Sequence, residues 1–351
     1  MAKPRAGLVL TGGGARAAYQ VGVVKAVRDI LGSPTRNPFP ILCGTSAGAI
    51  NAATLAVFAD DFSRAVGNLI EVWEHMRCEN IYRTDAWHIM KTGARWLSAM
   101  MLLSRHNPVS LLDNSPLRDM LQRNLAFARI QEHIDAGNLY AVCVTASGYT
   151  SGQSVSFFQG GSGLEGWERN QRIGAAVTLK LEYLLASAAL PFLFPAVKLH
   201  REYFGDGSMR QIAPVSPALH LGADRVLIVG TGRQAAAAGA DPARVRSTVY
   251  PSLAQIAGHA LNSIFLDSLA VDIERLERIA ARFLHELPRT VRFILGPTGA
   301  LNRSGSNLAS YLLFEESFCR ALIDLGYQDT ISRENEVREF FNPSQEEAMY
   351  A

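Results

Sequence analysis

The chain has 351 residues, of which 48% are hydrophobic and 19% are charged, so it can bury a large core and is not intrinsically disordered. Its formal net charge is +2, and its basic residues are spread along the sequence, which argues against a nucleic-acid partner. The uncharged stretch at 41–59 approaches the length of a membrane span, but the glycine, serine, threonine and asparagine residues inside it favour a buried strand, turn and helix.

An apolar strand pattern begins at Gly7, which leaves no room before it for a secretory signal peptide, so a cytoplasmic protein is expected. The four cysteines have mostly apolar neighbours and lack the paired spacing of a metal site. We therefore expect Cys43, Cys78, Cys143 and Cys319 to be reduced thiols in the core. Neither a metal nor a cofactor is expected.

Strand-like and helix-like patterns alternate along the part of the chain before residue 231. The predicted strands are at 7–10, 39–43, 139–146, 154–159, 197–204 and 225–230. The predicted helices are at 15–31, 49–59, 62–76 and 179–189. This alternation predicts an α/β fold, with helices on both faces of a sheet.

The C-terminal part of the chain has a different pattern. Residues 235–240 are all alanine or glycine, which marks the edge of the main domain, and apolar residues then recur at helical spacing from Leu253 to Phe283. The last residues are rich in glutamate, which predicts a solvated or disordered tail. The predicted division is a main domain at 5–234, a mainly helical extension at 235–334 and a polar acidic tail at 335–351.

A serine stands where the second predicted strand turns into a helix, within Gly44-Thr45-Ser46-Ala47-Gly48. This is the pattern of a nucleophile elbow, which places a hydroxyl at a helix N-terminus, close to backbone N–H donors. Gly44 and Gly48 flank Ser46 where the backbone crosses itself tightly and a Cβ would collide. Ser46 is therefore the candidate nucleophile, provided that a base lies near it.

A glycine-rich loop, 11–16, directly follows the first strand and opens a helix, so its N–H groups can converge on an anion. The anion is either the pyrophosphate of a dinucleotide or the oxyanion of a tetrahedral intermediate. The dinucleotide fits poorly, because Ala17 occupies the third glycine position and the next strand ends at Cys43 instead of an acidic residue.

Asp206 follows a predicted strand and lies between Gly205 and Gly207, in a turn that can aim a carboxylate into a cleft. It needs only hydrogen-bond reach to act directly as a base on Ser46. A Ser-His-Asp triad is the alternative, because two histidines follow Asp206 in the order that such triads use. These histidines, His220 and His259, do not lie in glycine-rich turns, which favours the direct Ser-Asp pair.

The three segments together resemble the patatin-like phospholipase family. The stretches 186–197 and 213–218 are also similar to that family's sequences before and after its aspartate, so the resemblance covers about 7–231. It implies a three-layer α/β/α sandwich with a largely parallel central sheet, plus a helical C-terminal flank. It also makes the main domain, 5–234, the catalytic domain.

By this resemblance the chain is a lipid acyl hydrolase of the phospholipase A or lysophospholipase kind. Ser46 attacks the ester carbonyl and Asp206 accepts and returns the proton, through an acyl-enzyme. The oxyanion is held by the backbone amides of Gly12, Gly13, Gly14 and Ala15. The supporting residues are Arg16, Gly44, Gly48 and Gly207.

Two positions depart from the family's pattern. Ala17 replaces the usual glycine after the basic residue, and Ser208 replaces the commoner glycine or alanine after Asp-Gly. Neither change removes a reacting group, and Ser208 could hydrogen-bond Asp206. For Arg16, an exposed arginine at the helix start is the alternative to a role in the loop.

The expected partner is a phospholipid or another acyl lipid. Two alternatives stay open: a thioesterase or acyltransferase with the same dyad, and a non-catalytic regulatory or binding protein with this fold.

Residues 87–106 combine a broad apolar face, a basic edge and two tryptophans, which suits an interfacial helix or lid at the membrane periphery. A helix that caps the core or forms a subunit contact is the alternative, favoured by Gly93 and by the few positive charges, and the oligomeric state is not predicted.

Overall fold

The computed structural model describes residues 4–83, 110–211, 213–230, 282–289, 291–292 and 306–342. The predicted interfacial segment 87–106, the run 235–240, most of the helical pattern from Leu253 and His259 lie outside these residues. In the described part of the chain, no helix is both long enough and apolar enough to cross a membrane.

The strands, in chain order, are β1 (Ala6–Leu10), β2 (Ile41–Thr45), β3 (Ala141–Gly148), β4 (Ser154–Gly160), β5 (Trp167–Arg169), β6 (Arg172–Ala176), β7 (Val197–Leu199), β8 (Glu202–Asp206) and β9 (Arg225–Val229). The α-helices are α1 (Ala18–Ile30), α2 (Ala47–Val57), α3 (Phe62–Glu74), α4 (Cys78–Ile81), α6 (Ser115–Asn124), α7 (Ala128–Asp135), α8 (Leu181–Ser187), α9 (Ser216–His220), α13 (Ser306–Leu312), α14 (Glu316–Ile331) and α15 (Glu334–Phe341). The short 3-10 helices are η1 (Gly14–Ala17), η2 (Gly207–Arg210) and η3 (Leu284–Glu286).

The described strands form one sheet in the order β5-β6-β4-β3-β2-β1-β9, with β8 paired to β3 and β7 paired to β8. The four adjacent strands β9, β1, β2 and β3 are parallel to one another. Antiparallel pairings begin where β3 meets β4 and β8. The predicted α/β fold around a largely parallel centre is confirmed, with a mixed sheet at one side.

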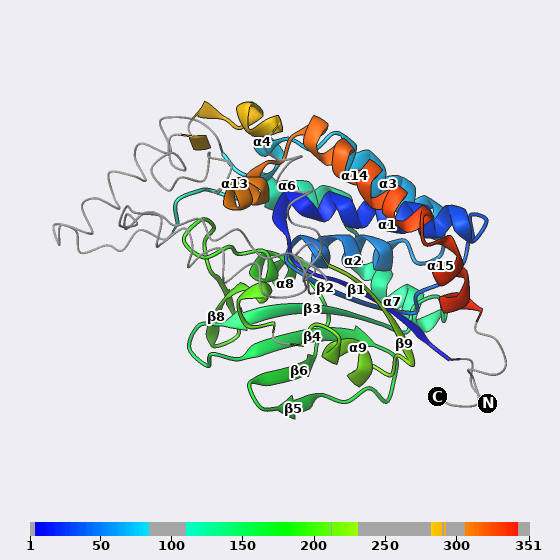
Figure 1. Ribbon diagram of the computed structural model, residues 1–351. Helices are drawn as coiled ribbons and strands as arrows, with labels where there is room; N and C mark the ends of the chain where they lie inside the picture. Colours follow the sequence, from blue (N-terminus) through cyan, green and yellow to red (C-terminus); the bar gives the residue numbers. More distant parts are fainter. Residues whose placement is uncertain are drawn as a thin grey trace, which may run out of the picture.

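Both faces of the sheet are covered by helices. Successive side chains of each strand point to opposite faces, so each face contributes to its own apolar cluster. Leu8, Leu10 and Leu42 belong to the large apolar core that includes α2, and Figure 1 shows α1, α3 and α14 stacked beyond α2. The intervening residues Val9 and Cys43 belong to a smaller cluster that includes Ala218 of α9. The three-layer arrangement is therefore confirmed, with one thick and one thin helical layer.

The predicted thiols behave as expected. All four cysteines are buried and free of disulfide bonds. Burial raises the pKa of the Cys78 and Cys319 thiols above the ordinary value, so they stay protonated at neutral pH.

The structure corrects one predicted strand. The stretch predicted as a single strand at 197–204 is the hairpin of β7 and β8, in which Val197 pairs with Phe204 and the turn includes His200 at a φ of 53°. Strands β5 and β6 and helices α6 and α7 had no prediction. Strands β5 and β6 are short and only partly buried, so their sequence lacks a regular apolar alternation.

The described C-terminal helices pack onto the first helix of the chain. An ideal Cβ on Gly22 of α1 would lie 2.0 Å from the carbonyl oxygen of Ile323, and one on Gly326 of α14 would lie 2.1 Å from that of Tyr19. Glycine at both positions therefore lets α1 and α14 touch through their backbones, and they lie side by side in Figure 1. The expected tail at 335–351 begins as helix α15 instead, because its apolar Val337 is buried; the domain division itself stays a prediction.

Candidate active site

Ser46 occupies a strained turn between β2 and α2. Its φ of 54° and ψ of −128° lie in a region that side-chain-bearing residues rarely adopt. An ideal Cβ on Gly44 would lie 2.4 Å from the carbonyl oxygen of Gly48, and one on Gly48 would lie 2.3 Å from that of Leu10. Only glycine fits at these two positions, so the surrounding backbone holds Ser46 in this turn.

Strand pairing explains how Asp206 reaches Ser46 from far along the chain. Strand β2 pairs with β3 as far as Thr45 opposite Thr145, and the chain then leaves the sheet at Ser46. Strand β8 pairs with the next residues of β3, beginning with Asp206 opposite Ala146. The other edge of β3 is taken by β4, so β8 occupies the place that β2 leaves empty. The two side chains therefore meet at the end of the parallel strands.

The two side chains make a direct hydrogen bond. Ser46 Oγ donates to Asp206 Oδ2 at 2.5 Å, and the backbone N–H of Ser208 donates to Asp206 Oδ1 at 2.9 Å. Asp206 is fully buried and Ser46 is 4% exposed. An ideal Cβ on Gly207 would lie 2.1 Å from the Thr145 carbonyl oxygen, so the residue after Asp206 is held tightly against β3.

The buried position changes the acidity of Asp206. Burial raises its pKa from the ordinary value of 3.8 to about 6, and hydrogen bonds from Ser46 and Ser208 oppose part of this rise. A carboxylate with a raised pKa is a stronger base than an exposed aspartate and is still deprotonated at neutral pH. The pair can therefore transfer a proton from the hydroxyl to the carboxylate.

The glycine-rich loop lies against this pair. An ideal Cβ on Gly12 would lie 3.1 Å from the Cβ of Ser46 and 2.1 Å from Ser208 Oγ. Gly14 lines the cavity next to Ser46 and has a φ of 55°. The loop leads into η1, where Arg16 is fully buried, so the alternative of an exposed arginine is wrong.

Ser187 is a site residue to which the sequence analysis gave no role. Its Oγ accepts a hydrogen bond from the Ser46 backbone N–H at 2.8 Å and donates to the Thr145 carbonyl oxygen at 2.6 Å. It therefore ties the elbow to β3. The serine within Ala186-Ser187-Ala188-Ala189 was the available signal, but only the fold shows what it contacts.

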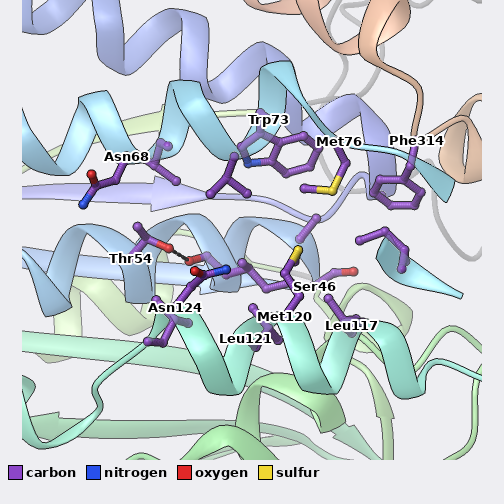
Figure 2. Close-up of a pocket in the computed structure, with 18 of the residues that line it drawn as sticks. Ser46, Thr54, Asn68, Trp73, Met76, Leu117, Met120, Leu121, Asn124 and Phe314 are labelled. Atoms are coloured by element: carbon purple, nitrogen blue, oxygen red, sulfur yellow. Dashed lines mark hydrogen bonds between the residues drawn. The ribbon is translucent and has the colours of Figure 1, made fainter. Parts of the chain in front are cut away.

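A cavity of about 450 Å³ extends from Ser46 between α3 and α6. Ala47, Ile50, Thr54 and Phe58 line it along one face of α2, which gives it a length of roughly 16 Å at the helical rise per residue. Most of the other lining side chains are apolar, including those of Leu69, Trp73, Met76, Leu117, Leu121, Leu190, Phe194 and Phe314. In Figure 2, Ser46 lies toward the end formed by Leu117 and Phe314, and the polar Thr54, Asn68 and Asn124 lie toward the other end.

The triad alternative with His220 does not fit this geometry, and His259 lies outside the described residues. The Asp206 oxygen bonds Ser46 directly, so no imidazole stands between them. His220 Nδ1 lies 2.8 Å from the carbonyl oxygen of Ser216 in its own helix, and its ring stacks on Trp167 at 4.8 Å. Among the described residues, no group of three or more His, Cys, Asp or Glu side chains is arranged to hold a metal ion.

A strained serine beside a buried carboxylate, at the end of an apolar cavity in an α/β fold, is typical of proteins that perform chemistry on an apolar molecule. Comparison with known sequences agrees. The sequence model of the patatin-like phospholipase family matches residues 8–219, more than half of the chain. The chain belongs to this family.

Two curated relatives are named as phospholipases. The chain is 27% identical to a cGAMP-activated phospholipase of Pseudomonas aeruginosa over 224 residues, which cover 61% of this chain and 55% of that protein. It is 46% identical to a cUMP-AMP-activated phospholipase of Escherichia coli over 50 residues, or 14% of this chain and 16% of that protein. The matches thus span about half of the first relative and less of the second.

One solved structure, VipD from Legionella pneumophila, aligns with 95% of this chain and 67% of its own chain, at 14% identity and a TM-score of 0.41.

Proposed function

We propose that this protein hydrolyses carboxylic esters of phospholipids or related acyl lipids through a Ser46-Asp206 dyad. The observation that carries the proposal is the 2.5 Å hydrogen bond between these side chains at the end of an apolar cavity of about 450 Å³. Membership of the patatin-like phospholipase family supports the class of substrate.

The proposed reaction begins when Ser46 Oγ attacks the ester carbonyl while its proton passes to Asp206 Oδ2. The negative charge then rests on the former carbonyl oxygen, for which we propose the amides of residues 12–15 as donors. The carbon–oxygen bond to the alcohol breaks, and the alcohol takes the proton from Asp206. Water then attacks the acyl-enzyme and gives a proton to Asp206, which returns it to Ser46 as the fatty acid leaves.

The cavity supports an acyl chain as the group that it holds. Its walls are mainly aliphatic and aromatic, and burial of each methylene group contributes about 0.8 kcal/mol. The exposed Glu71 and His75 lie on the same cavity wall as the partly buried Asn68, so the cavity has a polar rim on α3. We propose that the acyl chain lies along α2, with its carbonyl at Ser46.

A fluorophosphonate probe tests the proposed nucleophile. We expect covalent labelling of the wild-type protein, and its loss in Ser46→Ala and Asp206→Asn. The matched control is Ser332→Ala, since Ser332 is an exposed residue at the end of α14 and should leave labelling unchanged. A folded wild-type protein that is not labelled would favour the non-catalytic alternative.

Product analysis separates the enzyme alternatives. Purified protein is given a diacyl phospholipid, a lysophospholipid and an acyl thioester, each with and without an acceptor alcohol. Release of free fatty acid from the phospholipids supports the hydrolase. Preferred cleavage of the thioester, or transfer of the acyl group to the alcohol, would instead support a thioesterase or an acyltransferase.

We also propose that a cyclic dinucleotide increases this activity, because both curated relatives are named as activated by one. The hydrolysis assay is therefore run alone, with cGAMP and with cUMP-AMP. Higher turnover with either compound supports the proposal, and equal turnover in all three conditions contradicts it. Peripheral membrane contact through 87–106 stays a prediction.

A further inference from the structure

A short stretch at the end of α13, together with the residues after it, approaches Ser46 from the C-terminal part of the chain. We call residues 310–314 the C-terminal strap. Ser310 and Tyr311 are almost completely buried, and Phe314 lines the cavity that begins at Ser46. The region matched by the family ends at residue 219, so the strap lies outside it.

The strap contacts the one buried cation of the glycine-rich loop described above. Arg16 Nε donates a hydrogen bond to Ser310 Oγ at 2.7 Å, and both residues are fully buried. The Arg16 guanidinium also lies over the Tyr311 ring, 4.6 Å from its centroid. An arginine stays charged in proteins, so a buried guanidinium is stable only where such partners surround it. The strap therefore supplies two of the contacts that stabilise the buried Arg16.

The strap also touches the backbone of the loop. An ideal Cβ on Gly14 would lie 2.3 Å from the Tyr311 carbonyl oxygen, so the two backbones are in direct contact. Gly14 adopts a φ of 55° and faces the cavity with Ser46. The strap thus contacts the C-terminal end of the donor segment 12–15 at Gly14 and the residue directly after that segment, Arg16.

The strap itself is fixed on its other side. The Tyr82 hydroxyl donates to the Leu312 carbonyl oxygen at 2.8 Å, and the Phe314 ring stacks on Trp73 with centroids 6.3 Å apart. Helix α14 follows the strap and packs on α1, which begins directly after η1. The strap therefore joins the loop to buried side chains of the core and to the packed pair α1 and α14.

From these contacts we infer that Ser310 and Tyr311 are positioning residues, which hold the glycine-rich loop in the geometry that stabilises the oxyanion. The inference rests on the proposed function. They act through Arg16 and Gly14 and do not touch the reacting atoms. A displacement of oxyanion donors by about 1 Å can slow a reaction about 100-fold.

The test measures hydrolysis of a soluble short-chain ester by Ser310→Ala. We expect kcat to fall about 10-fold to 100-fold with KM changed less than about twofold, since the lost effect belongs to the transition state. A trifluoromethyl ketone, which forms a tetrahedral oxyanion with a serine, should lose affinity by the same factor as kcat. The pH dependence should not shift, because Asp206 is untouched.

Controls separate positioning from general damage. Ser317→Ala removes another hydroxyl from the same region, hydrogen-bonded to Glu286, and should keep wild-type kcat. Arg16→Lys combined with Ser310→Ala should be no slower than Arg16→Lys alone, because Ser310 acts through Arg16. If Ser310→Ala does not fold, Ser310→Cys, which keeps the size but weakens the acceptor, replaces it.

Three outcomes are distinguishable. An inactive wild-type protein contradicts the proposed function itself. An active wild type, with Ser310→Ala folded and equal to it in kcat and in inhibitor affinity, overturns the role of the strap. Independent, additive losses in the double variant also overturn it, because they would show that Ser310 does not act through Arg16.

Discussion

Two regions of the molecule meet at Ser46 and contribute different things. The region matched by the family, 8–219, holds the hydrogen-bonded Ser46 and Asp206. The described C-terminal residues 306–342 contribute contacts instead: a hydroxyl and a ring for Arg16, and a ring for the wall of the cavity. The first region provides the groups for the proposed chemistry, and the second constrains the shape around them.

This difference has a physical basis. Proton transfer requires two groups at hydrogen-bond distance, and here a pair of adjacent strand ends provides them. An oxyanion site and an acyl cavity require surrounding surfaces to exclude other conformations, and these surfaces can come from anywhere in the chain. The following predictions test how cleanly the two contributions separate.

The largest effect is expected in the first region. Asp206→Asn should lower kcat at least about 10⁴-fold, since an amide cannot accept the Ser46 proton. Ester hydrolysis measured with purified, folded variant is the check. A loss of less than about 10-fold would show that another group serves as the base.

The same substitution should make the protein more stable relative to the wild type as pH rises. Because the folded pKa of Asp206, about 6, is above its ordinary value of 3.8, the folded state binds the extra proton between these pH values. The contribution of Asp206 to stability therefore falls as pH rises through this window, by at most about 3 kcal/mol. The melting temperature of Asp206→Asn, relative to that of the wild type, should therefore increase from about pH 4 to about pH 8. A constant difference would contradict the raised pKa.

The pH dependence of activity is the next largest effect. With the pKa of Asp206 at about 6, kcat/KM for a neutral ester should be constant above neutral pH and fall about tenfold per unit below about pH 6. Short assays at each pH, followed by return to neutral pH, show whether the loss is reversible. A midpoint near 4 would mean that Asp206 is not desolvated in the working enzyme.

A pair of glycine substitutions tests how firmly the C-terminal region is held. Gly326→Ala would place a Cβ 2.1 Å from the Tyr19 carbonyl oxygen, so it should destabilise the protein by about 1–3 kcal/mol. Gly67→Ala in α3 is the matched control, because no atom lies within 4 Å of its ideal Cβ. It should stabilise by about 0.5–1 kcal/mol. Denaturant unfolding measures both changes in unfolding free energy. If both substitutions stabilise the protein, α1 and α14 are not in close contact.

The smallest effect is expected at the cavity wall. Phe314→Ala should widen the cavity near Ser46 and raise kcat/KM for esters of branched acids about 3-fold to 10-fold relative to straight-chain esters. Competition between the two esters measures the ratio. Phe283→Ala is the control, since Phe283 packs on Phe318 and is not among the lining residues. If this ratio of kcat/KM values is unchanged in Phe314→Ala, the strap does not influence substrate selection.

The fold class and the candidate residues could be predicted from the amino-acid sequence alone, because both depend on local patterns. The α/β alternation follows from apolar periodicity, and the elbow and the Asp-Gly turn are recognisable over a few residues. The short, partly polar strands β5 and β6 escaped prediction because packing, not their own periodicity, decides their pairing.

The contacts between distant segments became known only from the three-dimensional fold. That β8 takes the place of β2 beside β3, and so brings Asp206 to Ser46, is a property of strand order. The burial of Arg16 against Ser310 joins residues 294 positions apart, and no local pattern in either segment encodes that contact. Local sequence specifies which groups can react, whereas packing of the whole chain specifies which of them are held together.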